Sequence, residues 1–506
     1  MLPLKDKDKA LVQKLLSSGC CPRCVLRFCC INVQSAYKRP PQEILKELIE
    51  FIGDNSTVEI SETKTQSDAD AGQEAAEAPP PKRFKPDETG PTREEESPVC
   101  VLCLGILQEH CDQTLVSKMA ETVKAEKYEF DTLVLSVSLP AQLCVREHSC
   151  WLHVKTELRE KSLVLGKDDV IQVKEAFKWV MQSLVSKALG GAAVSAFEVG
   201  VEFVHPETDK DCHFLFCELL CFQSVFTRMA VVKALEKISE ANFLKHYPSP
   251  PTRPSSSCES RDIQCLHTSV FIAGRYNKFS RSLPQTPWLI GGERRMESSV
   301  EELIAGPSWT CFNFSSSGRE DVDVRTLGNG RPFAMELLNP HKSWFSREQI
   351  KQLQQTINSS SDKIHVRDLQ IVSRDAMGRM KEGEEEKTKT YRALVWTQKP
   401  IQKEDICFLN DIKELTLDQK TPLRVLHRRA LAVRPRVIHS MSSEYRDSHH
   451  FYLALKTQAG TYIKEFVHGD FGRTKPNMCE LLQTEADILE LDVESVDVDW
   501  PPPIPE

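Results

Sequence analysis

Apolar side chains recur at helical spacing in separate stretches of the chain. Residues 8–18 have helical character, and so do residues 41–52. In the second stretch, aliphatic side chains fall three or four positions apart, which predicts a helix with one buried face. They are Ile44, Leu45, Leu48, Ile49 and Ile52. A further stripe predicts a helix that ends before Gly190-Gly191, and it consists of Val173, Phe177, Val180, Met181 and Leu184.

Other stretches have the pattern of strands. Apolar residues alternate with Glu and Gly, as in a half-buried strand, at Phe197, Val199, Val201 and Phe203. Residues 132–139 have the composition of another strand. Because helices and strands are mixed along the chain, we expect an α+β fold.

Two stretches with few core-forming residues divide the chain. Residues 54–98 are rich in Ser, Asp, Glu, Ala and Pro, so they predict a disordered insertion. Residues 248–260 are a Pro- and Ser-rich linker. We therefore expect an N-terminal domain formed by 1–53 and 99–247, a C-terminal domain over 261–495 and a frayed tail at 496–506.

The insertion carries a short basic cluster of Lys82, Arg83 and Lys85 within proline-rich sequence. Such clusters can act as nuclear import signals. A solvated run of linker charge explains the cluster about as well.

Composition then narrows the class of protein. The chain has 506 residues and a formal net charge of −8, so bulk charge gives no sign of nucleic-acid binding. No apolar run approaches the roughly 20 residues of a membrane span. The charged N-terminus lacks an apolar signal core, so we expect an intracellular protein.

Eighteen cysteines are many for a reducing compartment, where disulfides are rare. Four of them form two Cys-x-x-Cys pairs, Cys21 with Cys24 and Cys100 with Cys103, which matches a tetrahedral structural zinc site. A redox pair and a coincidence in a cysteine-rich chain are the alternatives. The choice of ligands stays open because further cysteines lie nearby, at Cys20, Cys29, Cys30 and Cys111.

Residues 318–325 read Gly-Arg-Glu-Asp-Val-Asp-Val-Arg and contain the best candidate for chemistry. Asp321 lies between Arg319 and Arg325, whose positive charge favours an ionised carboxylate. An ionised, shielded carboxylate can be a covalent nucleophile. A solvated turn with a surface ion pair is the plain alternative. Asp321 and Asp323 could also hold a divalent metal, but the flanking arginines would compete with the cation.

Two stretches combine cations with features that suit RNA. In residues 274–288, Arg275, Lys278 and Arg281 are interleaved with aromatic residues that could stack on unpaired bases. Residues 419–436 contain six cations and no acid, which predicts a local basic patch that includes Arg428 and Arg429. A charged helix face or loop would have the same composition.

Four segments in a fixed order make the chain resemble a known family. They are Arg-Tyr-Asn-Lys-x-Ser-Arg, Gly-Arg-Glu-Asp-Val-Asp-Val-Arg, Tyr-Arg-Ala-Leu-Val and Gly-Thr-Tyr-Ile-Lys-Glu-Phe-Val-His-Gly-Asp-Phe-Gly-Arg-Thr. With the paired Cys-x-x-Cys motifs, they resemble the archaeal and eukaryotic tRNA pseudouridine synthase family called Pus-ten. The resemblance implies an N-terminal zinc-containing domain with a THUMP-type RNA-binding module. It also implies a C-terminal catalytic domain on a mixed, mainly antiparallel β-sheet.

The resemblance also implies roles for single residues. Asp321 would be the nucleophile, Tyr391 would stack on the target uracil, and Lys464 would be the basic partner of Asp321. Asp323 would instead be an ion-pairing or structural neighbour of Arg325. Ile463 and Leu491 would line an apolar pocket floor, with Tyr462 as a further substrate contact. Cations expected to contact the substrate are Arg275, Lys278, Arg281, Arg319, Arg428 and Arg429. The stretch from Arg281 to Arg294 would form a forefinger loop, and that from Gln419 to Arg434 a thumb loop.

The function implied by the resemblance is isomerisation of uridine to pseudouridine at position 54, position 55 or both in the TΨC arm of tRNA. It would need structural zinc at Cys21, Cys24, Cys100 and Cys103, but no organic cofactor. We expect a monomer in the nucleus and cytoplasm, with the mitochondrion as a further compartment. One alternative is a non-catalytic adaptor that binds hairpin RNAs such as microRNA precursors. A metal-dependent nuclease is another, weaker alternative.

Overall fold

The structure is a computed structural model of the 506-residue chain. It describes residues 2–53, 98–160, 165–190, 196–217, 226–306, 309, 311–380, 382, 387–502 and 504. The predicted disordered insertion and its basic cluster therefore lie, up to residue 97, outside the described residues. Among the helices described, none is long and apolar enough to span a membrane.

The chain forms two compact units, Met1–Leu266 and His267–Glu506. The boundary falls later than the sequence predicts, because the expected linker at 248–260 belongs to the first unit. Its backbone groups find partners there: Arg146 Nη1 donates to the Thr252 carbonyl at 2.9 Å. The Cys258 amide donates to the Leu104 carbonyl at 2.7 Å.

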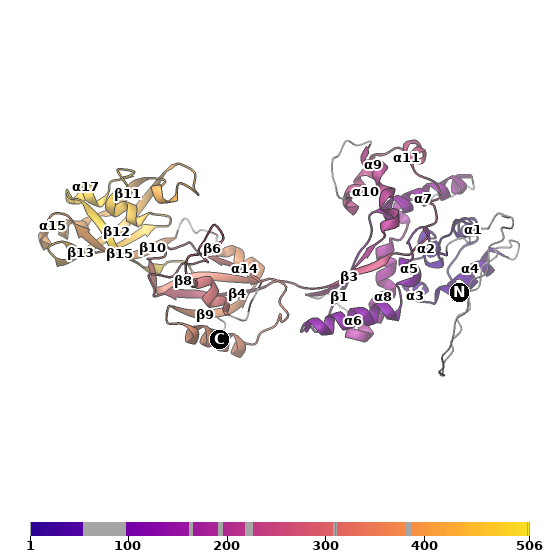
Figure 1. The fold of residues 1–506 in the computed structure, drawn as a ribbon, viewed down its shortest axis with the longest axis horizontal. Helices are drawn as coiled ribbons and strands as arrows, with labels where there is room; N and C mark the ends of the chain where they lie inside the picture. The colour runs from indigo at the N-terminus through magenta and orange to yellow at the C-terminus, as the bar shows by residue number, and fades with distance from the viewer. Residues whose placement is uncertain are drawn as a thin grey trace, which may run out of the picture. The chain divides into compact units, whose positions relative to one another are not determined.

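The first unit combines helices with a three-stranded sheet in the order β1-β2-β3 (Figure 1). Strands β1 and β2 are parallel, so the chain must cross over between them, and α7 and α8 lie in that crossover. The helices of this unit are α1 (Lys9–Ser17), α2 (Pro22–Phe28), α3 (Gln34–Tyr37), α4 (Pro41–Ile52), α5 (Ile106–Glu109), α6 (Gln113–Glu126), α7 (Gln142–Glu160), α8 (Val173–Leu189), α9 (His213–Cys217), α10 (Arg228–Lys237) and α11 (Glu240–His246). The strands are β1 (Val134–Ser138), β2 (Phe197–Val204) and β3 (Glu259–His267), and short 3-10 turns are η1 (Asp6–Asp8), η2 (Lys167–Asp169) and η3 (Pro206–Cys212).

The elements predicted from periodicity in this unit are confirmed. Helix α4 begins at Pro41 and ends at Ile52, as predicted, and the next residue is Gly53, whose φ of 84° is one that side-chain-bearing residues rarely adopt. Strand β2 alternates strictly between buried and half-buried positions. The apolar face of α8 is buried, because Phe177, Val180 and Met181 belong to the main core of the unit.

The second unit is built on a large sheet that has ten strands within the described residues. Its order is β14-β11-β12-β13-β10-β15-β8-β4-β9, with β7 also paired to β8. The pair β15–β8 is parallel, and the other recorded pairs of this sheet are antiparallel. The predicted mixed, mainly antiparallel sheet is therefore confirmed.

The strands of the second unit are β4 (Val270–Lys278), β5 (Leu289–Ile290), β6 (Glu293–Arg294), β7 (Phe312–Ser316), β8 (Arg325–Leu337), β9 (Ile364–Val372), β10 (Thr388–Thr397), β11 (Lys413–Lys420), β12 (Val433–Asp447), β13 (His450–Gln458), β14 (Thr474–Lys475) and β15 (Ala486–Val496). Its helices are α12 (Val300–Ala305), α13 (Arg347–Ser360), α14 (Arg374–Arg379), α15 (Lys403–Cys407), α16 (Ile463–His468) and α17 (Met478–Leu482), with 3-10 turns η5 (Phe408–Asp411) and η6 (Leu423–Val425). Helix α13 packs on β9, and α16 packs on β15.

The predicted frayed tail is packed against the second unit as far as Trp500. The Trp500 side chain is buried, and its indole N–H donates to the Ala376 carbonyl at 3.0 Å. The buried Arg275 guanidinium donates to the carbonyls of Val498 and Trp500 at 2.9 and 2.8 Å. The tail is ordered because it supplies acceptors for this buried cation.

Candidate functional site

A cleft of about 560 Å³ opens in the second unit. It is lined by the β7–β8 loop, the middle of the sheet at β10 and β15, the stretch around η6, and the start of α16. Among the lining side chains, eight are Lys or Arg and two are acids, Glu320 and Asp321. The cleft therefore carries an excess of positive charge and suits a polyanion.

The β7–β8 loop is fixed from below by a buried ion pair. Glu320 and Arg331 side chains are 1% and 2% exposed, and Arg331 Nε lies 2.6 Å from Glu320 Oε2. The other carboxylate oxygen of Glu320 accepts from the Tyr276 hydroxyl at 2.7 Å. Arg331 Nη1 also donates to the Ser317 carbonyl at 2.7 Å. Because Glu320 is anchored inward, the next residue along the loop, Asp321, is presented to the cleft.

Lys278 supports the same loop from β4. Its side chain is fully buried, and its ammonium donates to the carbonyls of Asp321 and Val322 at 3.1 and 2.8 Å. A third bond goes to the Leu283 carbonyl at 2.8 Å. Burial lowers the pKa of Lys278 to about 8, opposed by the nearby charge of Glu320. These contacts replace the RNA contact that the sequence predicts for Lys278.

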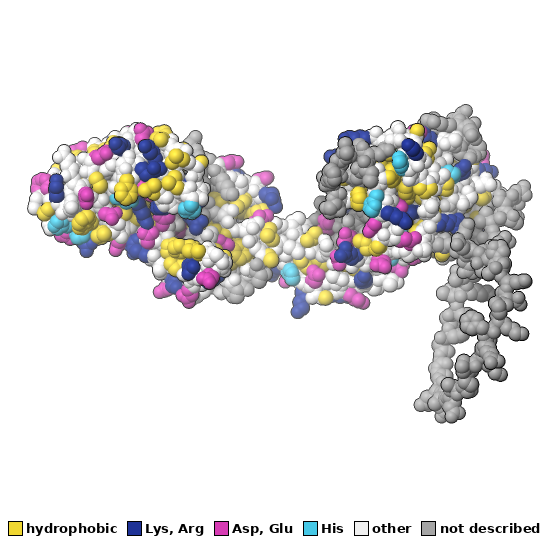
Figure 2. All heavy atoms as spheres, turned by 45° about the horizontal axis from the view of Figure 1, so that its top comes forward, with side chains coloured by type: hydrophobic (Ala, Val, Ile, Leu, Met, Phe, Trp, Pro, Cys, Tyr) yellow, Lys and Arg dark blue, Asp and Glu magenta, His cyan; other side chains and the backbone are white. Residues whose placement is uncertain are grey.

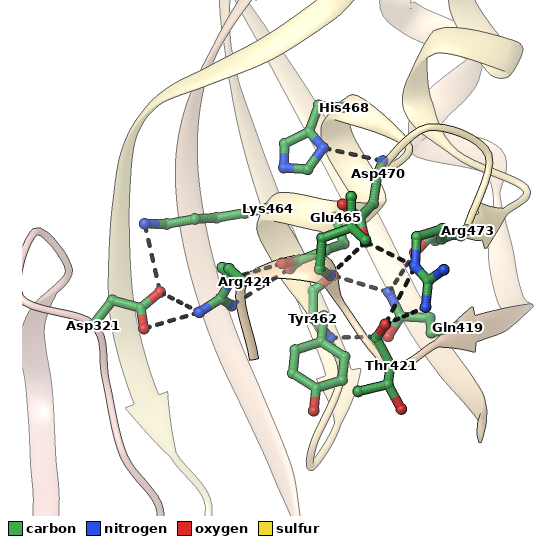
Figure 3. A network of polar contacts seen from close by, with 12 residues as sticks. Asp321, Gln419, Thr421, Arg424, Tyr462, Lys464, Glu465, His468, Asp470 and Arg473 are labelled. Carbon is green, nitrogen blue, oxygen red and sulfur yellow. Dashed lines mark hydrogen bonds and ion pairs between the residues drawn. The ribbon is translucent and has the colours of Figure 1, made fainter. Parts of the chain in front are cut away.

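The carboxylate of Asp321 faces two cations (Figure 3). Arg424 Nη1 lies 3.0 Å from both carboxylate oxygens, and Lys464 Nζ lies 3.5 Å from Oδ2. Arg424 comes from η6 and Lys464 from the first turn of α16. Arg424 and Lys464 thus place positive charge within 3.5 Å of the Asp321 carboxylate.

Asp321 and Asp323 do not pair with Lys464 and Arg325 in the way that the sequence predicts. Lys464 makes its hydrogen bonds to Asp323, at 2.7 and 2.9 Å, and approaches Asp321 only as a longer ion pair. Burial alone would raise the pKa of Asp323, but bonding to Lys464 lowers it. Arg325 does not pair with Asp323; it binds Asp492 with Nε at 2.8 Å and Nη2 at 2.5 Å. Strands β8 and β15 are parallel here, and Arg325 lies opposite Asp492 in their register.

Aromatic and aliphatic side chains line the cleft beside Asp321. Tyr391 lies on β10 opposite Val493 of β15, and burial raises the pKa of its hydroxyl. Ile463 and Leu491 are buried and contribute to the same lining. Tyr462 also lines the cleft, and its backbone N–H and carbonyl are both bound by the buried Gln419 amide, at 2.9 and 3.0 Å. The cleft thus contains a flat aromatic surface and an apolar floor of the kind a nucleobase needs.

Several of the cations predicted to contact RNA line the cleft and are exposed. Arg319, Arg428 and Arg429 are in this group. Figure 2 shows Lys and Arg side chains gathered over the part of the second unit that holds β11 and β12. Arg275 is not available for RNA, because it is 8% exposed and donates to five backbone carbonyls. Arg281 binds the carbonyls of Asp323 and Leu491, both at 2.9 Å, and so ties the loop to β15.

Sequence reasoning missed the residues that hold Asp321 in place. Arg424 was one of six cations in a basic stretch, and nothing local distinguished it from the others. Arg331 lies in a strand with no charged neighbour in the sequence to indicate its partner. One feature of the sequence did indicate a hidden partner. Glu320 directly precedes Asp321, and a carboxylate that is buried needs a cation or hydrogen-bond donors to pair with it.

The predicted metal ligands meet in the first unit. The Sγ atoms of Cys21, Cys24, Cys100 and Cys103 all lie within 4.8 Å of one another, and all four residues are buried. Tetrahedral zinc with Zn–S bonds of about 2.3 Å requires S···S separations of about 3.8 Å, so the cluster has the right size. The Cys21 amide donates to Cys100 Sγ at 3.2 Å, and Arg27 Nη1 donates to Cys24 Sγ at 3.5 Å. Such donors stabilise thiolates, so the residues present fit a structural zinc ion.

The chain is similar to known proteins along both units. The family model "Pus10, C-terminal" matches residues 271–497, and "Eukaryotic Pus10, N-terminal" matches residues 100–265. The chain is 56% identical to the tRNA pseudouridine synthase Pus10 of Mus musculus, and 56% identical to that of Homo sapiens, over 99% of each chain. It is 30% identical, over 98% of both chains, to the putative tRNA pseudouridine synthase Pus10 of Drosophila melanogaster.

These matches, with the sheet and its acid-bearing cleft, define a pseudouridine synthase, which is an isomerase. Within that class, the chain belongs to the Pus10 family.

The buried ion pair should be important for stability. We expect Glu320→Gln to lower the free energy of unfolding by about 3 kcal/mol, because it leaves the buried Arg331 charge without its counterion. Urea unfolding of the full chain measures the loss. The control is Glu490→Gln, which removes an exposed acid paired with Arg281 and should change stability by less than about 1 kcal/mol. Equal effects of the two substitutions would contradict the assignment.

Zinc binding can be tested at one thiol. We expect Cys100→Ser to lower the zinc-to-protein ratio from about one to near zero, since hydroxyl is a poor replacement for thiolate. Elemental analysis gives the ratio, and thermal unfolding should show a less stable first unit. Cys30→Ser is the matched control, because Cys30 is exposed and lies outside the cluster. Full zinc content in Cys100→Ser protein would contradict the prediction.

Proposed function

We propose that this chain converts uridine to pseudouridine in tRNA, at position 54, position 55 or both in the TΨC arm, with Asp321 as the nucleophile. One observation carries the proposal. Of the two acids that line the cleft, Glu320 is buried in its ion pair, whereas the Asp321 side chain is 35% exposed and faces the cleft. Relatives that are 56% identical over nearly their whole length are named tRNA pseudouridine synthases, which supports tRNA as the substrate.

The target base must leave its stack before Asp321 can reach it. Unstacking costs on the order of a few kcal/mol, and phosphate contacts together with base stacking offset it. Exposed Arg319, Arg428 and Arg429 are suited to the phosphates. Tyr391 supplies the stacking surface, with the apolar floor beneath the base.

The reaction needs an ionised carboxylate in a site that excludes water. Arg424 at 3.0 Å and Lys464 at 3.5 Å supply the positive charge beside that carboxylate. Asp321 assists cleavage of the N1–C1′ bond, by attack at C1′, by attack at uracil C6 or by removal of a C2′ proton. The free uracil turns, a C5–C1′ bond forms, C5 loses its proton and N1 gains one. Reactant and product are isomers, and the bond changes above balance without an oxidant, a reductant or an organic cofactor.

The first unit is the accessory part of this proposal. It would contribute an RNA-binding module of the THUMP type, folded around structural zinc at its four-cysteine cluster. The family resemblance supports the module, and the geometry of the thiols supports the metal. We further propose that the chain acts as a monomer in the nucleus and cytoplasm.

The test compares two neighbouring acids. With unmodified tRNA transcripts and pseudouridine mapped by nucleotide, we expect Asp321→Asn to lower the rate by about 10⁴-fold or more, because it removes the nucleophile. Its RNA affinity should stay the same or rise, since a negative charge is lost. Asp323→Asn is the matched control and should keep most of the activity, because Asp323 acts as a partner of Lys464.

Two outcomes would contradict the proposal. Substantial pseudouridine formation by the Asp321→Asn protein would exclude Asp321 as the nucleophile. Tight binding of hairpin RNA by the wild-type chain, with no pseudouridine formed in any transcript, would favour the non-catalytic adaptor.

A further inference from the structure

The strongest contact to the proposed nucleophile comes from the basic stretch at 419–436. Arg424 Nη1 lies 3.0 Å from each oxygen of Asp321. Arg428 and Arg429 of the same stretch line the cleft, yet neither has a recorded contact with Asp321. Lys464 gives its short contacts to Asp323. Arg424 therefore differs from Arg428 and Arg429, because it binds Asp321, whereas those two arginines are proposed to contact phosphates.

The orientation of Arg424 is set from its other side by a buried acid. Glu465 is 2% exposed, and its Oε1 accepts from Arg424 Nε at 2.6 Å. Although burial lowers the pKa of the Arg424 guanidinium, its bonds to Glu465 and Asp321 raise it above the usual value. Arg424 is thus a charged bridge between one buried carboxylate and one that faces the cleft (Figure 3).

The backbone on either side of Arg424 is also anchored. The Leu423 amide donates to Asp470 Oδ2 at 3.2 Å, and Arg473 Nη2 donates to the Thr421 carbonyl at 2.6 Å. The Lys420 amide donates to the Arg473 carbonyl at 2.9 Å. Asp470 and Arg473 follow α16, whose first turn carries Lys464, so one short segment positions both cations at Asp321 (Figure 3).

We propose that Arg424 is a further active-site residue that orients Asp321 and balances its charge, and that Glu465 is the positioning residue that holds Arg424. This inference rests on the proposed function, in which Asp321 is the nucleophile. A guanidinium is suited to the role because its fixed fork can bind two carboxylates at once, whereas an ammonium is a single point of charge.

A plainer role for Arg424 is one more phosphate contact, and the two roles predict different measurements. Loss of a phosphate contact weakens binding and lowers the salt slope of RNA affinity by about one unit, but leaves the rate constant of bound RNA unchanged. Loss of a group that orients the nucleophile lowers that rate constant and leaves the salt slope unchanged.

The experiment is single-turnover isomerisation of a tRNA transcript at saturating enzyme, with RNA affinity measured at several salt concentrations. Arg424→Met alone would strand the buried Glu465 charge, so Arg424→Met with Glu465→Gln is made as well. We expect both proteins to lose about 10²-fold in the rate constant at an unchanged salt slope. Arg424→Lys should lose less. Lys413→Met removes a cation that does not line the cleft, and it should match the wild type.

The same variants test the role of Glu465 through a double-mutant cycle. We expect Glu465→Gln to lower the rate constant in the wild-type background and to have little further effect once Arg424 is Met. Equal effects in both backgrounds would show that Glu465 acts on stability and does not position Arg424. Thermal unfolding of each variant separates loss of fold from loss of rate.

A wild-type rate constant in the folded double variant, together with a reduced salt slope, would overturn the inference. That result would leave the proposed function intact if Asp321→Asn protein is inactive. An active Asp321→Asn protein would instead overturn the proposed function and this inference with it.

Discussion

The position of Asp321, the candidate nucleophile, depends on the buried charge of the residue before it, Glu320. Glu320 can lie inside the second unit because Arg331 balances its charge in an ion pair and the Tyr276 hydroxyl donates to one of its oxygens. A buried carboxylate without such partners would cost several kcal/mol, so the pair must form whenever the unit folds. Once Glu320 points inward, the loop has little freedom at Asp321, and Lys278 fixes the backbone carbonyl of Asp321 itself. Folding and preorganisation of the site are therefore one event, since the contacts that stabilise the loop also aim its carboxylate.

The cleft combines two demands that oppose each other. A nucleobase needs apolar and aromatic surface, whereas the carboxylate and the RNA backbone need fixed positive charge. The structure meets both demands with side chains from neighbouring elements. Strands β10 and β15 supply Tyr391 and Leu491, and the start of α16 adds Ile463 to the apolar surface. The two cations that contact Asp321 come from η6 and α16.

Local pattern predicted several elements of the first unit and made the two Cys-x-x-Cys pairs and Asp321 candidates, whereas the roles expected for them came from the family resemblance. Helix α4 has the predicted bounds because its aliphatic spacing and flanking Pro and Gly are local features. The partners of the charges were not predictable in this way. Arg424 and Asp321 are 103 positions apart, and Arg325 and Asp492 are 167 apart, so their pairing depends on strand order rather than on spacing. Lys278 was predicted to contact RNA because it is interleaved with aromatic residues in 274–288. It is instead the last residue of β4, which lies between β8 and β9, and its side chain is fully buried.

The place of β15 in the sheet has a consequence for how the protein is made. Among the described strands this one comes last in sequence, yet it lies between β10 and β8, in the interior of the sheet order. Until it is synthesised, β8 and β10 each lack a neighbour, and Arg325 lacks the acid that binds it. A ribosome adds roughly 5–20 residues per second, so β8 and β10 stay unpaired on one side until residues 486–496 have been made. Chains that terminate early in this region would lack the strand that joins the two halves of the sheet. The cleft is therefore complete only after β15 has been made, because Leu491 and Val493 of this strand line it.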